Sequence, residues 1–201
     1  MSSENATFVL HTYFRSSCSA RIRIALNLKE LPYESVYVNL LSGQQSGSEY
    51  AKINPSRLVP TLQHVSAGAP GDSTDNTVSI PQSMAILEYL DEAFPDKPSL
   101  LPPASDPVGR ATVRALANII ACDTQPVTNL RILLRVTKLG GSKEDWAREL
   151  MCDGFAAYER LAAGTSGRFS YGDRITLADV CLVPAVWGHC GSGSSSTIFL
   201  S

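Results

Sequence analysis

The chain has 201 residues, of which 44% are hydrophobic and 18% are charged, and its formal net charge at pH 7 is -2. These values are typical of a globular protein with one large or two small domains, and they give no reason to expect nucleic acid or a membrane as a partner. No apolar run reaches the roughly 20 residues that span a bilayer, and the N-terminus lacks a secretory pattern, so we expect a cytosolic protein. The five cysteines include no C-x-x-C pair, which indicates neither a metal site nor a disulfide framework.

The chain begins with a predicted β-α-β unit. Residues 6–13 are rich in strand-forming side chains, and residues 17–28 carry apolar side chains at helical spacing. Residues 33–40 then alternate in the manner of a half-buried strand. This order within a short span predicts two parallel strands joined by a right-handed crossover.

The next segments predict two more strands and a helix. Residues 43–50 are polar and are predicted to form a loop. Residues 58–65 predict a strand that contains a proline, which favours an edge, a start or a bend because proline cannot donate to a sheet ladder. After a turn-rich loop at residues 66–76, a short strand precedes an amphipathic helix at residues 81–94.

The second half of the chain is predicted to be helical. Residues 95–107 contain five prolines and predict a linker between a domain at residues 1–94 and a helical domain at residues 108–201. The predicted helices span residues 108–138, interrupted at Pro126, then 146–163 and 172–188. In the last of these, Thr176 and Asp179 have the spacing of a capping box, and we expect Asp179 to serve folding rather than catalysis. From about residue 188 the chain becomes Ser/Gly-rich, an unusual end for a helical domain.

Two serines and a cysteine, Ser16, Ser17 and Cys18, lie where the first strand is predicted to turn into a helix. From the residues alone, three roles are open: a helix cap, a reactive cysteine, or a cradle for a ligand's reactive atom. Unpaired amides and the positive end of the helix dipole favour an anion at this point. Arg15 or Arg21 would add positive potential.

The stretch "SSCSARIRIAL" resembles the signature of the zeta-class glutathione transferases, with departures at Ala20 and Ile22. Further matches are "GQQ" at 43–45, "INP…VPTL" at 53–62, "QSMAILEYLDE" at 82–92, "TQPVTNL" at 124–130 and "GDRITLADVCLVP" at 172–184. The resemblance implies the glutathione transferase fold, an α/β thioredoxin-like N-terminal domain followed by an all-α C-terminal domain. After Trp187 the chain departs from the family pattern, so we expect a truncated C-terminus.

The same resemblance implies the activity. Glutathione would be the cofactor, no metal would be needed, and a small acid would be the substrate. The reaction would be the cis–trans isomerisation of maleylacetoacetate to fumarylacetoacetate in phenylalanine and tyrosine catabolism, with a side activity on small α-halo acids. The family usually forms homodimers, and we expect one here.

The resemblance also implies a set of site residues. Ser16 would be the leading donor to the glutathione sulfur, with Ser17 and Cys18 lining the same place. Val59, ahead of a cis proline, would offer its backbone to the peptide. The other implied contacts to glutathione are Arg21, Gln45, Gln82, Ser83, Gln125, Asn129 and Arg131.

Each of these assignments has a structural alternative. The serines and Gln82 are also suited to helix capping, Cys18 to a small half-buried position, and the residues around Pro126 to a solvated helix face. Two other functions are also open. One is a glutathione-dependent thiol oxidoreductase that uses Cys18, and the other is a non-catalytic dimerisation or binding module of the same fold, which the unusual tail suggests.

Overall fold

The computed structural model describes residues 7–66 and 76–190. The chain divides into two compact units, Met1–Pro98 and Ser99–Ser201. The Ser/Gly-rich tail at residues 191–201 and most of the predicted turn-rich loop lie outside the described residues, so the expectation of a truncated C-terminus falls there as well.

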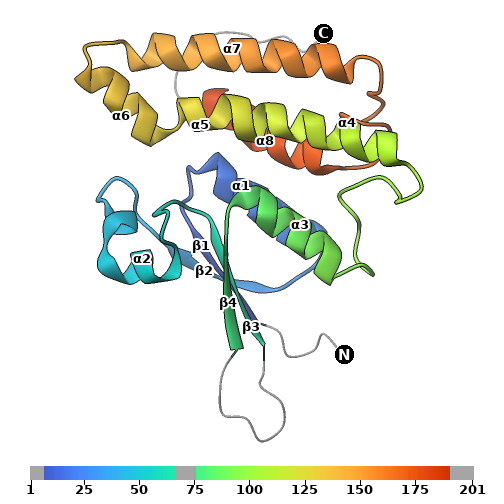
Figure 1. Ribbon diagram of the computed structural model, residues 1–201, viewed down its shortest axis with the longest axis horizontal. Coiled ribbons are helices and arrows are strands. Elements are labelled where there is room, and N and C mark those ends of the chain that lie inside the picture. The colour runs from blue at the N-terminus through green and yellow to red at the C-terminus, as the bar shows by residue number, and fades with distance from the viewer. Residues whose placement is uncertain (1–6, 67–75, 191–201) are drawn as a thin grey trace, which may run out of the picture. The chain divides into compact units, whose positions relative to one another are not determined.

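A four-stranded mixed sheet in the order β2-β1-β3-β4 forms the centre of the first unit (Figure 1). β1 (Thr7–Thr12) and β2 (Tyr33–Tyr37) pair in parallel and are joined by α1 (Ser17–Leu28), which confirms the predicted β-α-β unit. β3 (Thr61–Ser66) pairs antiparallel with β1 on one side and with β4 (Asn76–Pro81) on the other.

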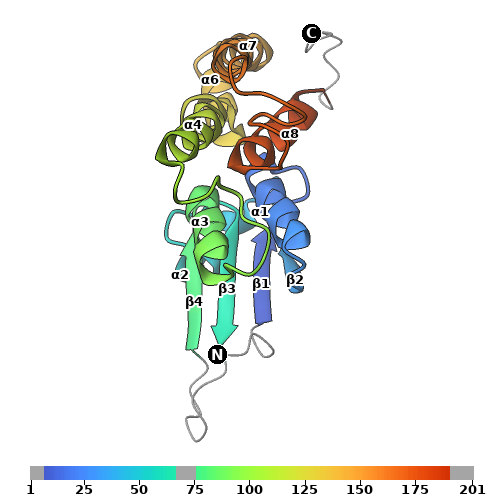
Figure 2. The same cartoon turned by 90° about the vertical axis from the view of Figure 1, so that its right-hand side faces the viewer.

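Helices cover both faces of this sheet. α1 and α3 (Ser83–Ala93) lie on one face, and α2 (Ser48–Ile53) lies on the other (Figures 1 and 2). Because side chains alternate along a strand, Leu10 of β1 is fully buried on the α1/α3 face while its neighbour His11 faces α2. The core of the α1/α3 face is apolar and fully buried, and includes Phe8, Leu10, Ile22, Leu26, Leu62, Ile86 and Leu90.

The prediction for one segment of the first unit is wrong. Residues 43–50 were predicted as a loop, but they contain the 3-10 turn η2 (Gln44–Ser46) and the start of α2. α2 has six residues and buries only Tyr50, so it is too short to show a helical period in the sequence. Tyr50 contacts the sheet through the ring of His11, with ring centroids 5.7 Å apart.

Apart from an isolated bridge between Ser166 and Gly172, the regular elements in the described part of the second unit are all helices, as predicted. Its elements in chain order are α4 (Pro107–Asn118), η3 (Ile119–Thr124), α5 (Gln125–Thr128), α6 (Leu130–Lys138), α7 (Lys143–Ala162) and α8 (Leu177–Cys190). α4 packs against α8, and α7 packs against η3, α5 and α6. Within residues 7–66 and 76–190, no helix has the length and apolarity needed to cross a membrane.

The predicted interruption at Pro126 is more extensive than a kink. η3 is a π-helical segment, in which the Thr124 hydroxyl donates to the Ile119 carbonyl at 2.8 Å. Pro126 follows in the first turn of α5, where a proline costs no hydrogen bond, and the extended backbone of Asn129 separates α5 from α6. A side chain at Gly154 of α7 would collide with Thr124, so the glycine permits the close packing of α7 on η3.

At the start of α8, the predicted Thr176–Asp179 pair forms the half of a capping box in which the acidic side chain accepts the N–H of Thr176. Asp179 Oδ2 accepts hydrogen bonds from the Thr176 backbone N–H at 2.8 Å and from its hydroxyl at 3.0 Å. The other oxygen, Oδ1, accepts the Ser170 N–H at 2.8 Å. All of the described contacts of this carboxylate therefore serve folding.

Candidate functional site

Ser16 caps the helix that follows the first strand. Its backbone is extended, and its Oγ accepts the Ser19 backbone N–H at 3.1 Å. Ser16 is therefore a helix cap, as the structural alternative predicts. The cap uses only an acceptor lone pair of the hydroxyl, so its donor proton remains available. Ser16 can cap α1 and still donate its proton to a ligand.

The start of α1 also presents unpaired backbone donors. The first N–H groups of a helix have no partner within it, and Ser16 satisfies those of Ser19 and Ala20. In the described part of the chain, the N–H groups of Ser17 and Cys18 have no acceptor. Ser16, Ser17 and Cys18 are half-buried, so the end of the helix is open to a small anion.

The strand register gathers three of the predicted segments at one edge of the sheet. His11, close to the end of β1, pairs with Thr61 at the start of β3, and Thr61 pairs with Pro81 at the end of β4. The segment of Ser16 follows β1, Val59 precedes β3, and the segment of Gln82 and Ser83 follows β4. Residues separated by more than 60 positions in the chain therefore converge on one edge of the first unit.

Val59 lies just outside the sheet ladder. The Val59–Pro60 peptide bond is cis, and the described ladder of β3 begins at Thr61. The N–H and C=O of Val59 are therefore not used by a neighbouring strand, and an extended peptide could pair with them.

A buried hydrogen-bond network holds the turn that carries Val59. The Asn54 amide nitrogen donates to the Leu58 carbonyl at 2.7 Å and to Thr61 Oγ1 at 3.0 Å. The Tyr50 hydroxyl also donates to the Leu58 carbonyl, at 2.7 Å, and lies 2.9 Å from Thr61 Oγ1. Burial raises the pKa of Tyr50, so its hydroxyl remains protonated as a donor at neutral pH. Tyr50, Asn54 and Thr61, whose side chains form this network, were not predicted as site residues, because they meet only in the folded chain.

The start of α3 has a strained backbone at Gln82 and a buried cation, Arg21, bound to Ser83. Gln82 has a φ of 73°, a left-handed conformation that is costly for a residue other than glycine and is often kept at functional sites. Ser83, the first residue of α3, is buried, and its Oγ accepts a hydrogen bond from Arg21 Nη1 at 3.1 Å. Arg21 is 1% exposed, so its guanidinium lies beneath this helix end rather than at the surface.

Gln45 in η2 offers an unsatisfied acceptor. Its Oε1 is buried and has no hydrogen-bond partner among residues 7–66 and 76–190. The neighbouring Gln44, by contrast, uses its Oε1 to accept the Asn39 N–H at 2.7 Å. An unpaired buried amide oxygen is unfavourable, and a ligand with a suitable donor would satisfy it.

The remaining predicted residues belong to the second unit. Asn129 is the N-cap of α6, where its Oδ1 accepts the Ile132 N–H at 3.1 Å and its Nδ2 donates to the Pro126 carbonyl at 2.8 Å. Gln125 is half-buried at the start of α5, and Arg131 is exposed on α6. The Asn129 amide is therefore occupied by capping, whereas Arg131 is open to solvent.

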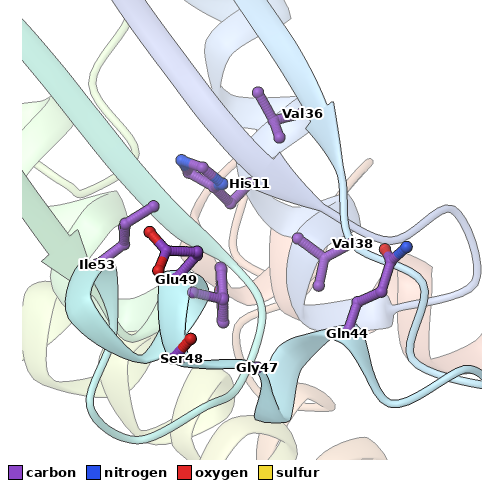
Figure 3. A pocket seen from close by; sticks show the side chains of 9 residues that line it. His11, Val36, Val38, Gln44, Gly47, Ser48, Glu49 and Ile53 are labelled. Atoms are coloured by element: carbon purple, nitrogen blue, oxygen red, sulfur yellow. The ribbon is translucent and has the colours of Figure 1, made fainter.

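A separate pocket lies under α2. It has a volume of about 340 Å³, and its lining, shown in Figure 3, is His11, Val36, Val38, Gln44, Gly47, Ser48, Glu49, Tyr50 and Ile53. The His11 ring in its wall is hydrogen bonded to Gln63 Oε1 at 2.8 Å. None of the predicted site residues lines it, although Gln44 and Ile53 belong to segments that match the family, so this pocket is distinct from the predicted site. In the described part of the chain, no group of three or more His, Cys, Asp or Glu residues could hold a metal ion.

Comparison with known proteins identifies relatives along most of the chain. The family described as glutathione S-transferase, N-terminal domain, matches residues 15–93. A maleylacetoacetate isomerase from Emericella nidulans is 58% identical over 182 residues, which cover 89% of this chain and 76% of that protein.

Solved structures agree in fold. The crystal structure of a maleylacetoacetate isomerase from Anaeromyxobacter dehalogenans, with glutathione bound in its active site, superimposes with a TM-score of 0.79 at 40% identity. The match covers 93% of this chain and 82% of that one. A maleyl pyruvate isomerase described as a bacterial zeta-class glutathione S-transferase gives a TM-score of 0.78 at 39% identity, over 91% of this chain and 82% of that one.

Proposed function

The chain belongs to the zeta class of glutathione transferases, the family of the maleylacetoacetate isomerases, and we propose that it converts maleylacetoacetate to fumarylacetoacetate with glutathione as cofactor. The observation that carries the proposal is the capped start of α1, where Ser16 keeps a free hydroxyl proton beside the unpaired N–H groups of Ser17 and Cys18. Unsatisfied buried polar atoms on Arg21 and Gln45 further support a polar ligand in the first unit.

The start of α1 would stabilise a thiolate. A free cysteine thiol has a pKa of about 8.5, so little of it is ionised at neutral pH. The Ser16 hydroxyl, two backbone N–H groups and the positive end of the α1 dipole all favour the charged form over the neutral one. These donors would lower the pKa of a thiol placed there.

When bound, glutathione supplies the sulfur that adds to the conjugated cis double bond, allows rotation about the resulting single bond, and then leaves as the trans product forms. The chain's own contribution is to hold the ends of the cofactor. Val59 would pair with the cysteinyl backbone, Gln45 would contact the peptide, and the start of α3 at Gln82 and Ser83 would bind the γ-glutamyl carboxylate. The amides of Ser17 and Cys18 would hold the thiolate before addition and again when the sulfur leaves.

By the family resemblance, Gln125, Asn129 and Arg131 would also bind glutathione or the substrate, and the exposed Arg131 is a cation suited to an acidic group. By the same family argument, the protein would act in phenylalanine and tyrosine catabolism, in the cytosol and as a homodimer. The sulfur nucleophile also suits displacement of halide from small α-halo acids.

The test is conversion of maleylacetoacetate by the full chain, with and without glutathione. Ser16→Ala should lower kcat/KM about ten- to hundredfold, since a hydrogen bond to a charged group contributes about 1.5–3 kcal/mol. Ser142→Ala is the matched control, because Ser142 caps α7 through the same kind of bond, Oγ to the Asp145 N–H at 3.1 Å. It should cost similar stability without reducing turnover. If the two variants lost kcat/KM equally, Ser16 would act only as a helix cap and not in catalysis.

The alternative of a thiol oxidoreductase rests on Cys18, which is half-buried in the first turn of α1. Cys18→Ala should leave most isomerisation intact, whereas an oxidoreductase would lose thiol transfer. A folded chain that is not retained on immobilised glutathione would instead favour a non-catalytic binding module.

A further inference from the structure

Arg21 is a buried cation without a described counter-ion. Its side chain is 1% exposed, and its Nη1 donates to Ser83 Oγ at 3.1 Å. Its Nε and Nη2 are buried and have no hydrogen-bond partner within residues 7–66 and 76–190. Arginine is always protonated in proteins, and a buried charge is normally paired, so this arrangement is unfavourable without an anion nearby.

The bond to Ser83 fixes how that hydroxyl can act. Ser83 Oγ accepts from Arg21, so its own proton remains free to be donated. A hydroxyl polarised by a cation is a stronger donor to an anion than one that is not, because hydrogen bonds in a chain reinforce each other. Ser83 is also the first residue of α3, an eleven-residue helix whose positive dipole end lies at the same place.

We propose that Arg21 is a positioning residue that acts through Ser83 to hold the γ-glutamyl α-carboxylate of glutathione at the start of α3. The inference rests on the proposed function, and it assigns the charge of Arg21 to the carboxylate end of the cofactor rather than to its sulfur. The left-handed backbone of Gln82, which precedes Ser83, is consistent with a segment shaped for a ligand.

The experiment compares two ligands on the full chain by calorimetry. One is glutathione, and the other is 4-aminobutanoyl-cysteinyl-glycine, which lacks only the α-carboxylate. Arg21→Gln should weaken glutathione binding about tenfold or more while changing the affinity for the analogue less than about twofold. Arg21→Lys, which keeps the charge, should recover most of the lost affinity. The pH titration of the bound thiol should be the same in the wild type and in Arg21→Gln.

Arg23 provides a matched control on the same helix. It is also hydrogen bonded, with Nη1 donating to Thr12 Oγ1 at 2.7 Å, but none of its described hydrogen bonds reaches α3. Arg23→Gln should show no preference between the two ligands. If Arg21→Gln does not fold, Ser83→Ala is measured in its place. It should lose affinity for glutathione but not for the analogue without the carboxylate.

Equal weakening of both ligands by Arg21→Gln and by Ser83→Ala would overturn the inference, as would a raised thiol pKa with an unchanged preference for the carboxylate. Failure of the wild type to bind glutathione would instead overturn the proposed function. The two failures are therefore distinguishable in one set of measurements.

Discussion

Asn54 should be one of the most sensitive positions in the first unit. Its side chain is 1% exposed and takes part in four hydrogen bonds. Two are donated by Nδ2, to the Leu58 carbonyl and to Thr61 Oγ1, and two are accepted by Oδ1 from the N–H and hydroxyl of Ser56. The first pair spans the Val59–Pro60 turn from both sides.

The expected loss follows from these contacts. Ser56 is exposed, so water can replace the two bonds it makes, whereas the partners of Nδ2 are not replaced as easily. At about 0.5–1.5 kcal/mol for each buried bond, plus the cavity left by truncation, Asn54→Ala should lower the free energy of unfolding by about 2–4 kcal/mol. Asn54→Asp should cost at least as much, because it replaces two donors by oxygen beside a carbonyl.

The assay is urea unfolding followed by glutathione titration of the folded fraction. Asn39→Ala is the control, because Asn39 is exposed and its Oδ1 accepts two backbone N–H groups, from Leu41 at 3.0 Å and from Ser42 at 3.3 Å. It should lose less than about 1 kcal/mol. Similar losses in the two alanine variants would refute the role given to burial. A destabilised Asn54→Ala with undiminished glutathione affinity would refute the link between this network and the ligand.

Three further outcomes are expected. Gln82→Gly should relieve the left-handed strain and raise the unfolding midpoint slightly in urea, while glutathione affinity falls because the side chain is lost. Asp91→Asn should cost about 3–5 kcal/mol in urea unfolding because it leaves the fully buried Lys29 without its charged partner 2.8 Å away, whereas exposed Glu49→Gln should cost about 0–1 kcal/mol. Burial lowers the pKa of His64 below the value of about 6.5 in an unfolded chain, so the unfolded state binds more protons as the pH falls through this range and stability decreases. Unfolding free energies at pH 7.5 and 5.5 should show this decrease, and His64→Gln should reduce it; an unchanged difference would contradict the assignment.

Features that depend on neighbouring residues could be predicted from the sequence. The cap of α1 by Ser16 and the Thr176–Asp179 box each join residues three positions apart, so the pattern that forms the contact is visible in the chain. The β-α-β unit likewise follows from hydrophobic periodicity over continuous segments. The similarity of the motifs to one family supplied the cofactor and the reaction, which no periodicity contains.

Other features were decided only by the tertiary structure. α2 was missed because six residues with one buried side chain leave no period to detect. The contact between Arg21 and Ser83 joins positions 62 residues apart, and the network around Asn54 depends on a turn and a strand meeting a short helix. Local patterns in the chain located the starts of α1 and α3 to within two residues, with the residue types that stand at those points, because capping hydrogen bonds and periodicity act within a few residues. Which of those points share one edge of the sheet, and which buried charge lies beneath them, was decided by strand pairing and packing, because these bring distant residues together.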